Sequence, residues 1–495
     1  MNISHGRNLF YWLVESASAP STDPLVLWTN GGPGCSGVSG GLFSELGPFF
    51  ANSDGSLGLT PNAWTWTSSA NVIFIEQPSG VGFSFSDTPS DYTTGDYQSA
   101  ADVYAFLLGF IARFPQYANR PLYLSGESYV RFIALHAAPA APATATLTNP
   151  PKPPTRPRTP RPLTNQGGHY VPSFAKAIVE GNAAGVNPRL NLVGFLVGNA
   201  WTVADLDNTG ALDFWHSRTM IDTATYDGVL ATCNMSDVGP LAAAAGGRVR
   251  LEADWEIAAG VAAGSRRRPL GFSPLRDAAT GGAVLHAGLS CDDWTNAAFA
   301  LISGIDIYDV YDNVCTESAT AKALGGRAAA AAISPRAGAD SNNAAGCAQN
   351  FDPCRDARTT TYLNTPAVKA AIHANASITW SGCSSVVDYS RFDLLTSMLP
   401  VYRELFAAKL RILVYSGDVD AIVPSLGSRA WIAALNLTAR APLRAWSLDG
   451  QVGGWTTSYP ELDFTTVRNA GHFVPELQGS RALALFKAFI AGTPL

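Results

Sequence analysis

The sequence predicts an α/β protein, in which helices cover both faces of a mostly parallel central sheet. Two short apolar runs, residues 25–28 and 72–75, have the composition of strands that are buried on both faces. Between residues 96 and 114 the apolar side chains recur at helical spacing, which indicates an amphipathic helix. Strand patterns return at residues 121–125, 192–197 and 412–415. This alternation of strands and helices is typical of βαβ units.

The composition excludes several classes of protein. The chain has 495 residues, which is enough for two or three domains or for one large elaborated domain. With 47% apolar and 15% charged residues, it is not a wholly disordered chain. The net charge of −6 argues against nucleic acid as the main partner, because phosphate binding needs clustered Lys and Arg. No apolar stretch reaches about 18 uninterrupted residues, so we expect no membrane-spanning helix.

The rhythm of strands and helices divides the chain into three segments. We expect a first part of the core at residues 1–202, a cap or insertion region at residues 203–350 and a second part of the core at residues 351–495. Residues 130–166 hold nine prolines, five Arg or Lys and no acid, which predicts an extended or disordered loop. Residues 239–288 and 319–345 are rich in Ala, Gly and Arg, and we expect them to be irregular.

The cysteines and the sequons favour a protein of the secretory pathway, extracellular or vacuolar, over a cytosolic protein, which the absence of a signal peptide would equally allow. None of the seven cysteines belongs to a C-x-x-C pair or lies near a His at zinc-ligand spacing. No structural metal is therefore expected, and six of the cysteines could form three disulfides. Four N-x-S/T sequons begin at Asn2, Asn234, Asn375 and Asn436. No signal peptide precedes the first strand pattern at residues 8–14, and we interpret this as a truncated N-terminus.

Three residue types in a fixed order carry the pattern of a serine hydrolase. Ser128 lies in Gly-Glu-Ser-Tyr just after a strand pattern, which is similar to a nucleophile elbow, although Val130 stands where G-x-S-x-G has its second Gly. Asp418 and Asp420 follow a later strand, and His472 lies in a loop after another. A serine nucleophile needs a base and an acid that orients it, and α/β-hydrolases have the order Ser, acid, His. Each residue alone could be an ordinary turn or loop residue, so the order carries the prediction.

A glycine-rich loop at residues 30–36 supplies the other requirement of such a site. Acyl transfer needs hydrogen-bond donors around the developing oxyanion, and backbone N–H groups often provide them. Glycines allow the backbone to approach a substrate closely. The loop by itself is equally consistent with a plain glycine turn.

Seven motifs in order resemble the serine carboxypeptidase family. They are LVLWTNGGPGCSG, ELGP, NVIFIEQPSGVGFSFS, LSGESY, GGHYVP, VYSGDVDAIVP and NAGHFVPE, and the resemblance runs from about residue 10 to residue 489. It implies an α/β-hydrolase fold, a central mostly parallel sheet with helices on both faces, and an inserted cap region. It also implies a serine-type carboxypeptidase that removes single residues from the C-termini of peptides and proteins at acidic pH, without a metal or other cofactor.

The resemblance assigns roles to individual residues. The catalytic triad would be Ser128, Asp420 and His472, with Asp420 rather than Asp418 as the acid. The backbone N–H groups of Gly32 and Tyr129 would form the oxyanion hole. The terminal carboxylate of the substrate would be bound by Asn30, Glu45 and Glu127. Two ionised glutamates would repel a carboxylate, so they must share protons, and we expect peptidase activity to fall as the pH rises above mild acidity.

The family pattern also implies how the cysteines pair. The expected disulfides are Cys35–Cys383, Cys233–Cys291 and Cys315–Cys354, which leave Cys347 over. The glycosylation candidates are Asn234, Asn375 and Asn436. Peptide and protein C-termini are the expected partners, with neither nucleic acid nor a membrane, and the oligomeric state stays open.

The sequence departs from the family at one point beside the nucleophile. The family pattern GESYGGHYVP is interrupted after Tyr129 by 37 residues, 130–166, and their removal restores the pattern with its missing Gly. We interpret this insert as an unspliced, in-frame intron of the gene model. The helix after the nucleophile normally supports the serine, and a misplacement of about 1 Å can lower the rate roughly a hundredfold. The chain as written is therefore expected to fold and to be impaired.

Two other functions compete with peptide hydrolysis. Some relatives use the same triad to transfer acyl groups to alcohols, and Asn30, Glu45 and Glu127 favour peptides over that reading. A catalytically impaired, binding or chaperone-like relative is a reading from a different class. The complete triad argues against this reading, while the insert at 130–166 argues for it. A serine-reactive fluorophosphonate label on Ser128 would distinguish the two.

Overall fold

The computed structural model describes residues 1–4, 6–52, 58–128, 168–186, 188–238, 288–315 and 351–495. The three segments predicted to be irregular lie outside these ranges, apart from Gly288, and so do Tyr129 and Cys347. No helix in the described ranges is long and apolar enough to cross a membrane.

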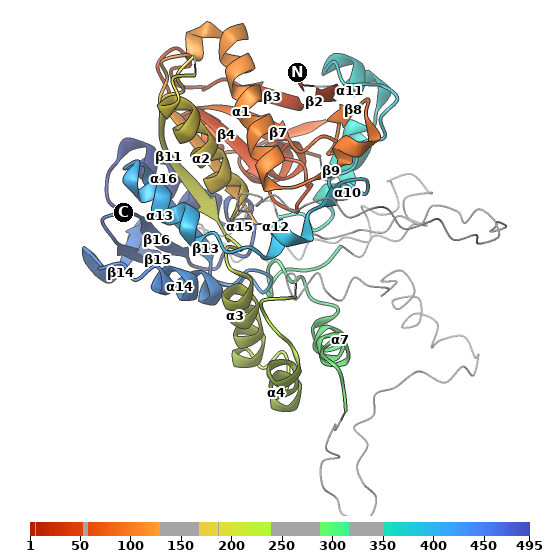
Figure 1. Ribbon diagram of the computed structural model, residues 1–495, viewed down its shortest axis with the longest axis vertical. Coiled ribbons are helices and arrows are strands. Elements are labelled where there is room, and N and C mark those ends of the chain that lie inside the picture. The colour runs from red at the N-terminus through yellow and green to blue at the C-terminus, as the bar shows by residue number, and fades with distance from the viewer. Residues whose placement is uncertain (5, 53–57, 129–167, 187, 239–287, 316–350) are drawn as a thin grey trace, which may run out of the picture.

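A nine-stranded sheet forms the centre of the protein (Figure 1). Its strands, in spatial order, are β14 (Ala441–Leu448), β15 (Gln451–Ser458), β16 (Asp463–Val467), β13 (Arg411–Gly417), β11 (Leu192–Gly198), β10 (Leu122–Glu127), β4 (Leu25–Asn30), β7 (Asn71–Glu76) and β3 (Phe10–Val14). The strands from β16 to β7 run parallel, and β3, β14 and β15 add antiparallel edges. The α/β class predicted from the sequence is confirmed.

Three small sheets and a set of helices complete the described chain. The small sheets join β1 (Asn2–Ser4), β2 (Arg7–Asn8) and β8 (Phe85–Ser86), then β5 (Phe49–Ala51) and β6 (Leu59–Pro61), then β9 (Thr93–Thr94) and β12 (Asp388–Tyr389). The helices are η1 (Val38–Glu45), η2 (Trp66–Ser68), η3 (Pro89–Tyr92), α1 (Asp96–Arg113), η4 (Pro115–Tyr117), α2 (Tyr170–Ala183), α3 (Ala204–Ser217), α4 (Thr223–Thr232), α7 (Cys291–Ile302), α10 (Arg355–Leu363), α11 (Pro366–Ala371), α12 (Arg391–Leu395), α13 (Leu399–Ala407), α14 (Ser425–Ala434), α15 (Val474–Leu477) and α16 (Gly479–Ala491).

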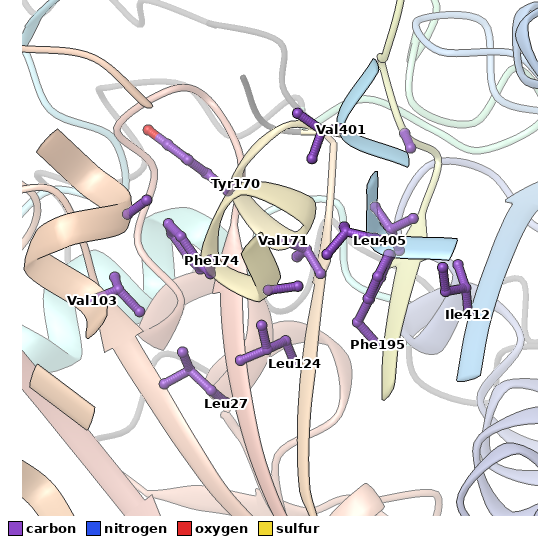
Figure 2. Packing of buried hydrophobic residues seen from close by; sticks show 14 of the residues in the cluster. Leu27, Val103, Leu124, Tyr170, Val171, Phe174, Phe195, Val401, Leu405 and Ile412 are labelled. Carbon is purple, nitrogen blue, oxygen red and sulfur yellow. The ribbon is translucent and has the colours of Figure 1, made fainter. Parts of the chain in front are cut away.

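Alternation along the strands produces two apolar layers, one on each face of the sheet. Leu27, Leu124 and Phe195 point to one face, where they pack with apolar residues of α1, α2, α13 and α14 (Figure 2). Trp28 and Tyr123 point to the other face, where they pack with residues of η1 and α16. Both faces of the central strands are therefore buried, which is why these strands read as continuous apolar runs.

The strands and the helix predicted from the sequence are present at the expected residues, with two differences. The strand pattern at 8–14 is divided at Leu9, because β2 pairs with β8 while β3 pairs with β7. The strand predicted at 121–125 continues as β10 to Glu127, so it ends at the residue before Ser128. The second difference matters for the site, because it places Glu127 on a rigid strand rather than in a turn.

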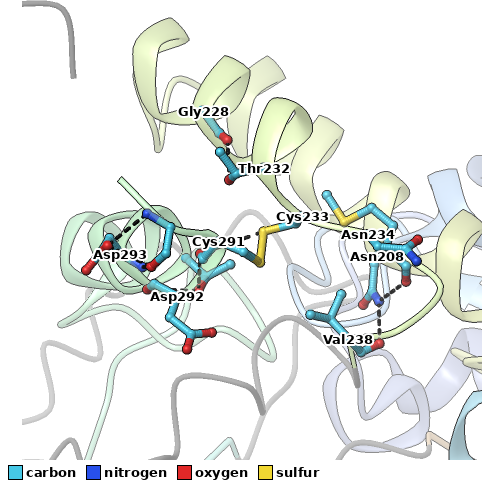
Figure 3. The surroundings of a disulfide bond; sticks show 12 residues. Asn208, Gly228, Thr232, Cys233, Asn234, Val238, Cys291, Asp292 and Asp293 are labelled. Carbon is cyan, nitrogen blue, oxygen red and sulfur yellow. Dashed lines mark hydrogen bonds between the residues drawn. A yellow bond between two sulfur atoms is a disulfide. The ribbon is translucent and has the colours of Figure 1, made fainter. Parts of the chain in front are cut away.

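The segment between β11 and β13 builds a separate apolar cluster within the predicted cap region. Trp215 of α3, Val229 of α4 and Trp294 of α7 are buried in this cluster. The Cys233–Cys291 disulfide joins the end of α4 to the start of α7 (Figure 3). Figure 1 shows these three helices outside the central sheet, below its lower end.

Two further disulfides tie distant segments to the surroundings of the sheet. Cys35 in the glycine-rich loop is bonded to Cys383. Cys315, at the end of the cap segment, is bonded to Cys354, directly before α10. With Cys233–Cys291, these are the three pairs that the family pattern implies.

Candidate active site

Ser128 directly follows the carboxyl end of β10. Its φ of 61° lies in the left-handed region, which is uncommon for a residue other than glycine and is a feature of the nucleophile elbow. The Ser128 N–H donates a hydrogen bond to the Gly198 carbonyl at the end of β11, with an N···O distance of 3.0 Å. A Cβ atom at Gly126 would lie 2.5 Å from the Thr29 carbonyl oxygen, so the close approach of β4 requires glycine there. The two residues of the motif thus meet different geometric requirements: Gly126 allows β4 to approach closely, and Ser128 adopts a left-handed backbone conformation.

Asp420 and His472 form a buried hydrogen-bonded pair beyond the ends of β13 and β16. The His472 Nδ1 atom lies 2.7 Å from Asp420 Oδ2, and both side chains are fully buried. The backbone N–H groups of Ile422 and Val423 donate to Asp420 Oδ1 at 2.8 and 3.2 Å. Asp418 instead accepts a hydrogen bond from a backbone N–H in the loop before His472. The geometry therefore shows that Asp420, and not Asp418, contacts His472, a choice that the residues alone left open.

Asn199 is a member of this network that the sequence reasoning missed. Its Nδ2 atom donates to Asp420 Oδ2 at 2.6 Å, and its Oδ1 atom accepts the Gly417 N–H at 3.2 Å. The residue directly follows β11, as Ser128 follows β10, so its position after a buried strand was the available signal. Asn199 holds the oxygen of Asp420 that contacts His472.

The cap segment contacts the histidine loop directly. The His472 N–H donates to the Tyr308 carbonyl oxygen at 2.6 Å, and the two rings meet edge to face with centroids 5.2 Å apart. Tyr308 also stacks on Phe473, with centroids 5.1 Å apart. His472 Nε2, the ring atom that would meet a serine hydroxyl, is buried and has no hydrogen-bond partner in the described ranges. Such catalytic hydrogen bonds often tighten only when substrate binds.

Asn30, Glu45 and Glu127 converge beside Ser128. The Asn30 Nδ2 atom donates to Glu45 Oε1 at 3.0 Å and to Glu127 Oε1 at 2.9 Å. Its Oδ1 atom accepts hydrogen bonds from Trp28 Nε1 at 2.7 Å and from the Gly41 N–H at 3.1 Å, which fixes the orientation of the amide. β10 and β4 are in register so that Glu127 lies opposite Asn30, and this pairing brings the cluster to the residue before Ser128.

The two glutamates of this cluster favour their protonated forms. Burial raises the pKa of Glu45. Burial and the charge of the neighbouring Glu45 raise the pKa of Glu127 well above its usual range. The Oε2 atom of each glutamate is buried and receives no hydrogen bond from a donor in the described part of the chain. The cluster can therefore hold a proton between two carboxyl groups and offer it to an anion.

The glycine-rich loop is built so that its backbone approaches the site closely. Gly32 has a φ of 115°, and a Cβ atom there would lie 2.7 Å from the backbone nitrogens of Gly34 and Cys35. Only glycine fits this position. Tyr129, the second predicted donor of the oxyanion hole, lies outside the described residues. The described residues contain no group of His, Cys, Asp and Glu that could hold a metal ion.

The fold, the serine directly after a central strand and the buried Asp–His pair define an α/β-hydrolase. A family model described as serine carboxypeptidase matches residues 1–132 and 166–492. The protein belongs to the serine carboxypeptidase family. The match is interrupted at residues 133–165, within the predicted insert.

Individual relatives agree with this assignment. Serine carboxypeptidase 24 of Arabidopsis thaliana is 34% identical over 504 aligned positions, which cover 100% of this chain and 88% of that protein. Serine carboxypeptidase-like 26 of the same plant is 34% identical over 501 positions, with the same coverage of both chains. Kex1(delta)p, described as a prohormone-processing carboxypeptidase from Saccharomyces cerevisiae, has a TM-score of 0.63 at 19% identity and covers 98% of this chain and 87% of its own. At that identity the likeness supports the fold alone.

Proposed function

We propose that the protein hydrolyses the C-terminal peptide bond of peptides and proteins at mildly acidic pH. The observation that carries this proposal is the cluster of Asn30, Glu45 and Glu127, two buried carboxyl groups on one amide directly beside Ser128. A free carboxylate at the end of a peptide is the ligand that such a proton-sharing pair would select. An ordinary esterase, whose substrate has no free carboxylate, needs no such carboxyl pair in addition to its triad.

The proposed mechanism is that of a serine peptidase with an acyl-enzyme intermediate. Ser128 Oγ attacks the carbonyl carbon of the last peptide bond, and His472 takes the hydroxyl proton. His472 then gives the proton to the departing amine, and a water molecule hydrolyses the acyl-enzyme. Asp420 holds the imidazole by the 2.7 Å hydrogen bond at Nδ1 and stabilises its charged form. The N–H groups of Gly32 and Tyr129 are the proposed donors to the oxyanion.

The test is hydrolysis of a blocked dipeptide by the chain as written. We expect slower release of the C-terminal residue at mildly acidic pH by the chain as written than by a chain without residues 130–166. For both chains we expect little hydrolysis of the same dipeptide with a C-terminal amide. Equal cleavage of the acid and the amide would refute the carboxylate site. Transfer of the acyl group to an alcohol in preference to water would favour the acyltransferase alternative.

The insert at 130–166 requires a matched variant that lacks only these residues. If the chain as written is inactive and the shortened chain is active, the insert blocks a competent site. A serine-reactive fluorophosphonate tests the nucleophile independently, because labelling at Ser128 requires an activated serine. We propose that the insert is an unspliced intron, and the break in the family match supports this. A tryptic peptide that crosses residues 129–131 would refute it.

We further propose that the protein works in the secretory pathway. Its three disulfides are typical of oxidising compartments. The proposed glycosylation sites Asn234, Asn375 and Asn436 are all exposed, as an acceptor must be. Release of mass by an N-glycosidase from secreted material would test these sites.

A further inference from the structure

The Arg355 side chain joins three elements at the back of the candidate site. Arg355 is the first residue of α10, and its side chain is only 6% exposed. Its Nη1 atom donates to Glu476 Oε1 at 2.5 Å and to the Ser44 carbonyl oxygen at 3.0 Å. The guanidinium also lies over the Phe50 ring, 4.3 Å from the centroid. One buried cation thus contacts α15, η1 and β5.

Two of these elements carry residues of the candidate site. Ser44 precedes Glu45 at the end of η1, so the hydrogen bond from Arg355 is made one residue from a proposed carboxylate ligand. Glu476 lies in α15, four residues after His472. Both α10 and α15 pack against η1. Arg355 therefore connects the backbone of the carboxylate site to the helix that follows the proposed base.

The disulfide at Cys354 limits the freedom of this connection. Cys354 directly precedes Arg355 and is bonded to Cys315, at the end of the cap segment. Tyr308 of the same segment accepts the His472 N–H. The start of α10 is thereby fixed from two sides, by the disulfide and by the ion pair.

Stability alone does not account for a buried pair of this kind. Removing two charges from water costs free energy that their attraction does not reliably return, and apolar pairs of similar volume are often as stable. A planar guanidinium, in contrast, holds two acceptors in a fixed relative geometry. The distinctive consequence of Arg355 is geometric, since it sets how η1 and α15 lie relative to each other.

The pair also controls a charge close to the two site glutamates. Burial raises the pKa of Glu476 to about 8, while Arg355 acts in the opposite direction. Glu476 in turn contributes to the raised pKa of Glu127, as Glu45 does. Asp356 and Asp306 face the same group from α10 and from the cap segment. Loss of Arg355 would therefore raise the pKa of Glu476 further.

We propose that Arg355 and Glu476 are positioning residues, which hold the proposed carboxylate site and His472 at the separation that a C-terminal peptide bond requires. This inference rests on the proposed function. A substrate with a free C-terminal carboxylate must engage Glu45, Glu127 and the triad together. A blocked amino-acid ester has no such carboxylate and needs only the triad. Loss of the pair should therefore affect the first substrate more than the second.

The experiment measures the ratio of kcat/KM for a blocked dipeptide to kcat/KM for the corresponding blocked amino-acid ester, with the full chain. We expect Arg355→Met to lower this ratio by about tenfold to a hundredfold, because a shift of about 1 Å has effects of that size. The loss should fall mainly on KM for the dipeptide. The double variant Arg355→Met with Glu476→Met removes the unpaired carboxyl group but not the geometric defect, so we expect the ratio to stay low. Arg355→Lys should restore it in part.

Arg358→Met provides a matched control on the same helix. Arg358 Nε lies 2.6 Å from Asp352 Oδ2, and these side chains are 13% and 15% exposed, against 6% and 7% for the pair under test. This variant should lower the stability without changing the ratio. An Arg355→Met ratio equal to that of Arg358→Met would overturn the proposal.

A binding measurement tests the same proposal if the chain hydrolyses its substrates too slowly for kinetic measurement. Calorimetry with the free amino acid that the reaction releases, whose carboxylate is the one assigned to Asn30, Glu45 and Glu127, and with the amide of that amino acid tests the carboxylate site without the chemical step. Weaker binding of the acid alone by Arg355→Met would support the proposal, and unchanged binding would overturn it. If the unaltered chain binds acid and amide equally, the proposed carboxylate site fails, and the positioning role fails with it.

Discussion

Replacement of Glu127 by Gln should remove the decline of peptidase activity with rising pH. Glu127 Oε1 already accepts a hydrogen bond from Asn30 Nδ2 at 2.9 Å. A glutamine can therefore keep its carbonyl oxygen there and place its amide nitrogen at the position of Oε2. The amide donates at every pH, whereas the carboxyl group donates only while it holds a proton.

The sign follows from the raised pKa of the pair. Burial and Glu45 raise the pKa of Glu127, so the proton-sharing form exists at acidic pH and is lost as the pH rises. Each pH unit above the apparent pKa of the pair reduces that form tenfold. On the alkaline side, kcat/KM of the unaltered protein should thus fall tenfold per pH unit relative to Glu127→Gln. At acidic pH the variant should be the weaker enzyme, by roughly tenfold, the price of one weaker hydrogen bond.

The assay is kcat/KM for a blocked dipeptide across the pH range, with a blocked amino-acid ester as the control substrate. The ester lacks the carboxylate, so its profile should be the same in both proteins. If the dipeptide profile of Glu127→Gln declines as steeply as that of the unaltered protein, proton sharing at this residue is not the cause. An identical decline with the ester would lead to the same conclusion.

Three further substitutions test other contacts. Asp420→Asn should lower kcat about 10⁴-fold in the ester assay, because the amide would face the Asn199 donor and no longer orient the imidazole; a loss below tenfold would remove Asp420 from the triad. Burial raises the pKa of Glu76 from 4.5 to about 7. Its contribution to the free energy of unfolding is therefore complete below about pH 4.5, and roughly 3 kcal/mol of it is lost as the pH rises through 7. Urea unfolding at pH 5 and 8 should show a smaller fall for Glu76→Gln than for the unaltered protein, and equal falls would contradict this. Gly471→Ala would place a Cβ atom 2.1 Å from the Tyr308 carbonyl oxygen, and kcat should drop about a hundredfold; unchanged kcat would show that this contact yields freely.

The sequence was sufficient for the central sheet because local composition determines it. Residues 25–28 and 72–75 are apolar throughout, and β4 and β7 are buried on both faces. The order of Ser128, Asp420 and His472 was also readable, since each follows a strand and parallel strands end at one edge of the sheet. The choice between Asp418 and Asp420 came from the family resemblance alone, because the residues themselves do not show which carboxylate reaches the imidazole.

Hydrogen bonds between backbone groups that are far apart in the sequence could not be predicted, because they do not depend on side-chain type. The Tyr308 carbonyl accepts the His472 N–H across 164 positions of chain, and every residue type offers the same carbonyl group. No side-chain pattern records such a bond. Asn199 was a nearer miss, because it follows a buried strand as the other site residues do.

Arg355 and Glu476 illustrate why charged residues in the later part of the chain were hard to interpret. In a sequence, an Arg at a helix start and a Glu in a helical turn are read as solvated, because exposed charges are the rule. Here they are 121 positions apart, yet side chains only 6% and 7% exposed form one ion pair. Their burial depends on the packing of α10 and α15 against η1, which no local pattern in the sequence records. The proposed positioning role of this pair therefore belongs to the assembled fold, and comparison with Arg358→Met separates that role from a loss of stability alone.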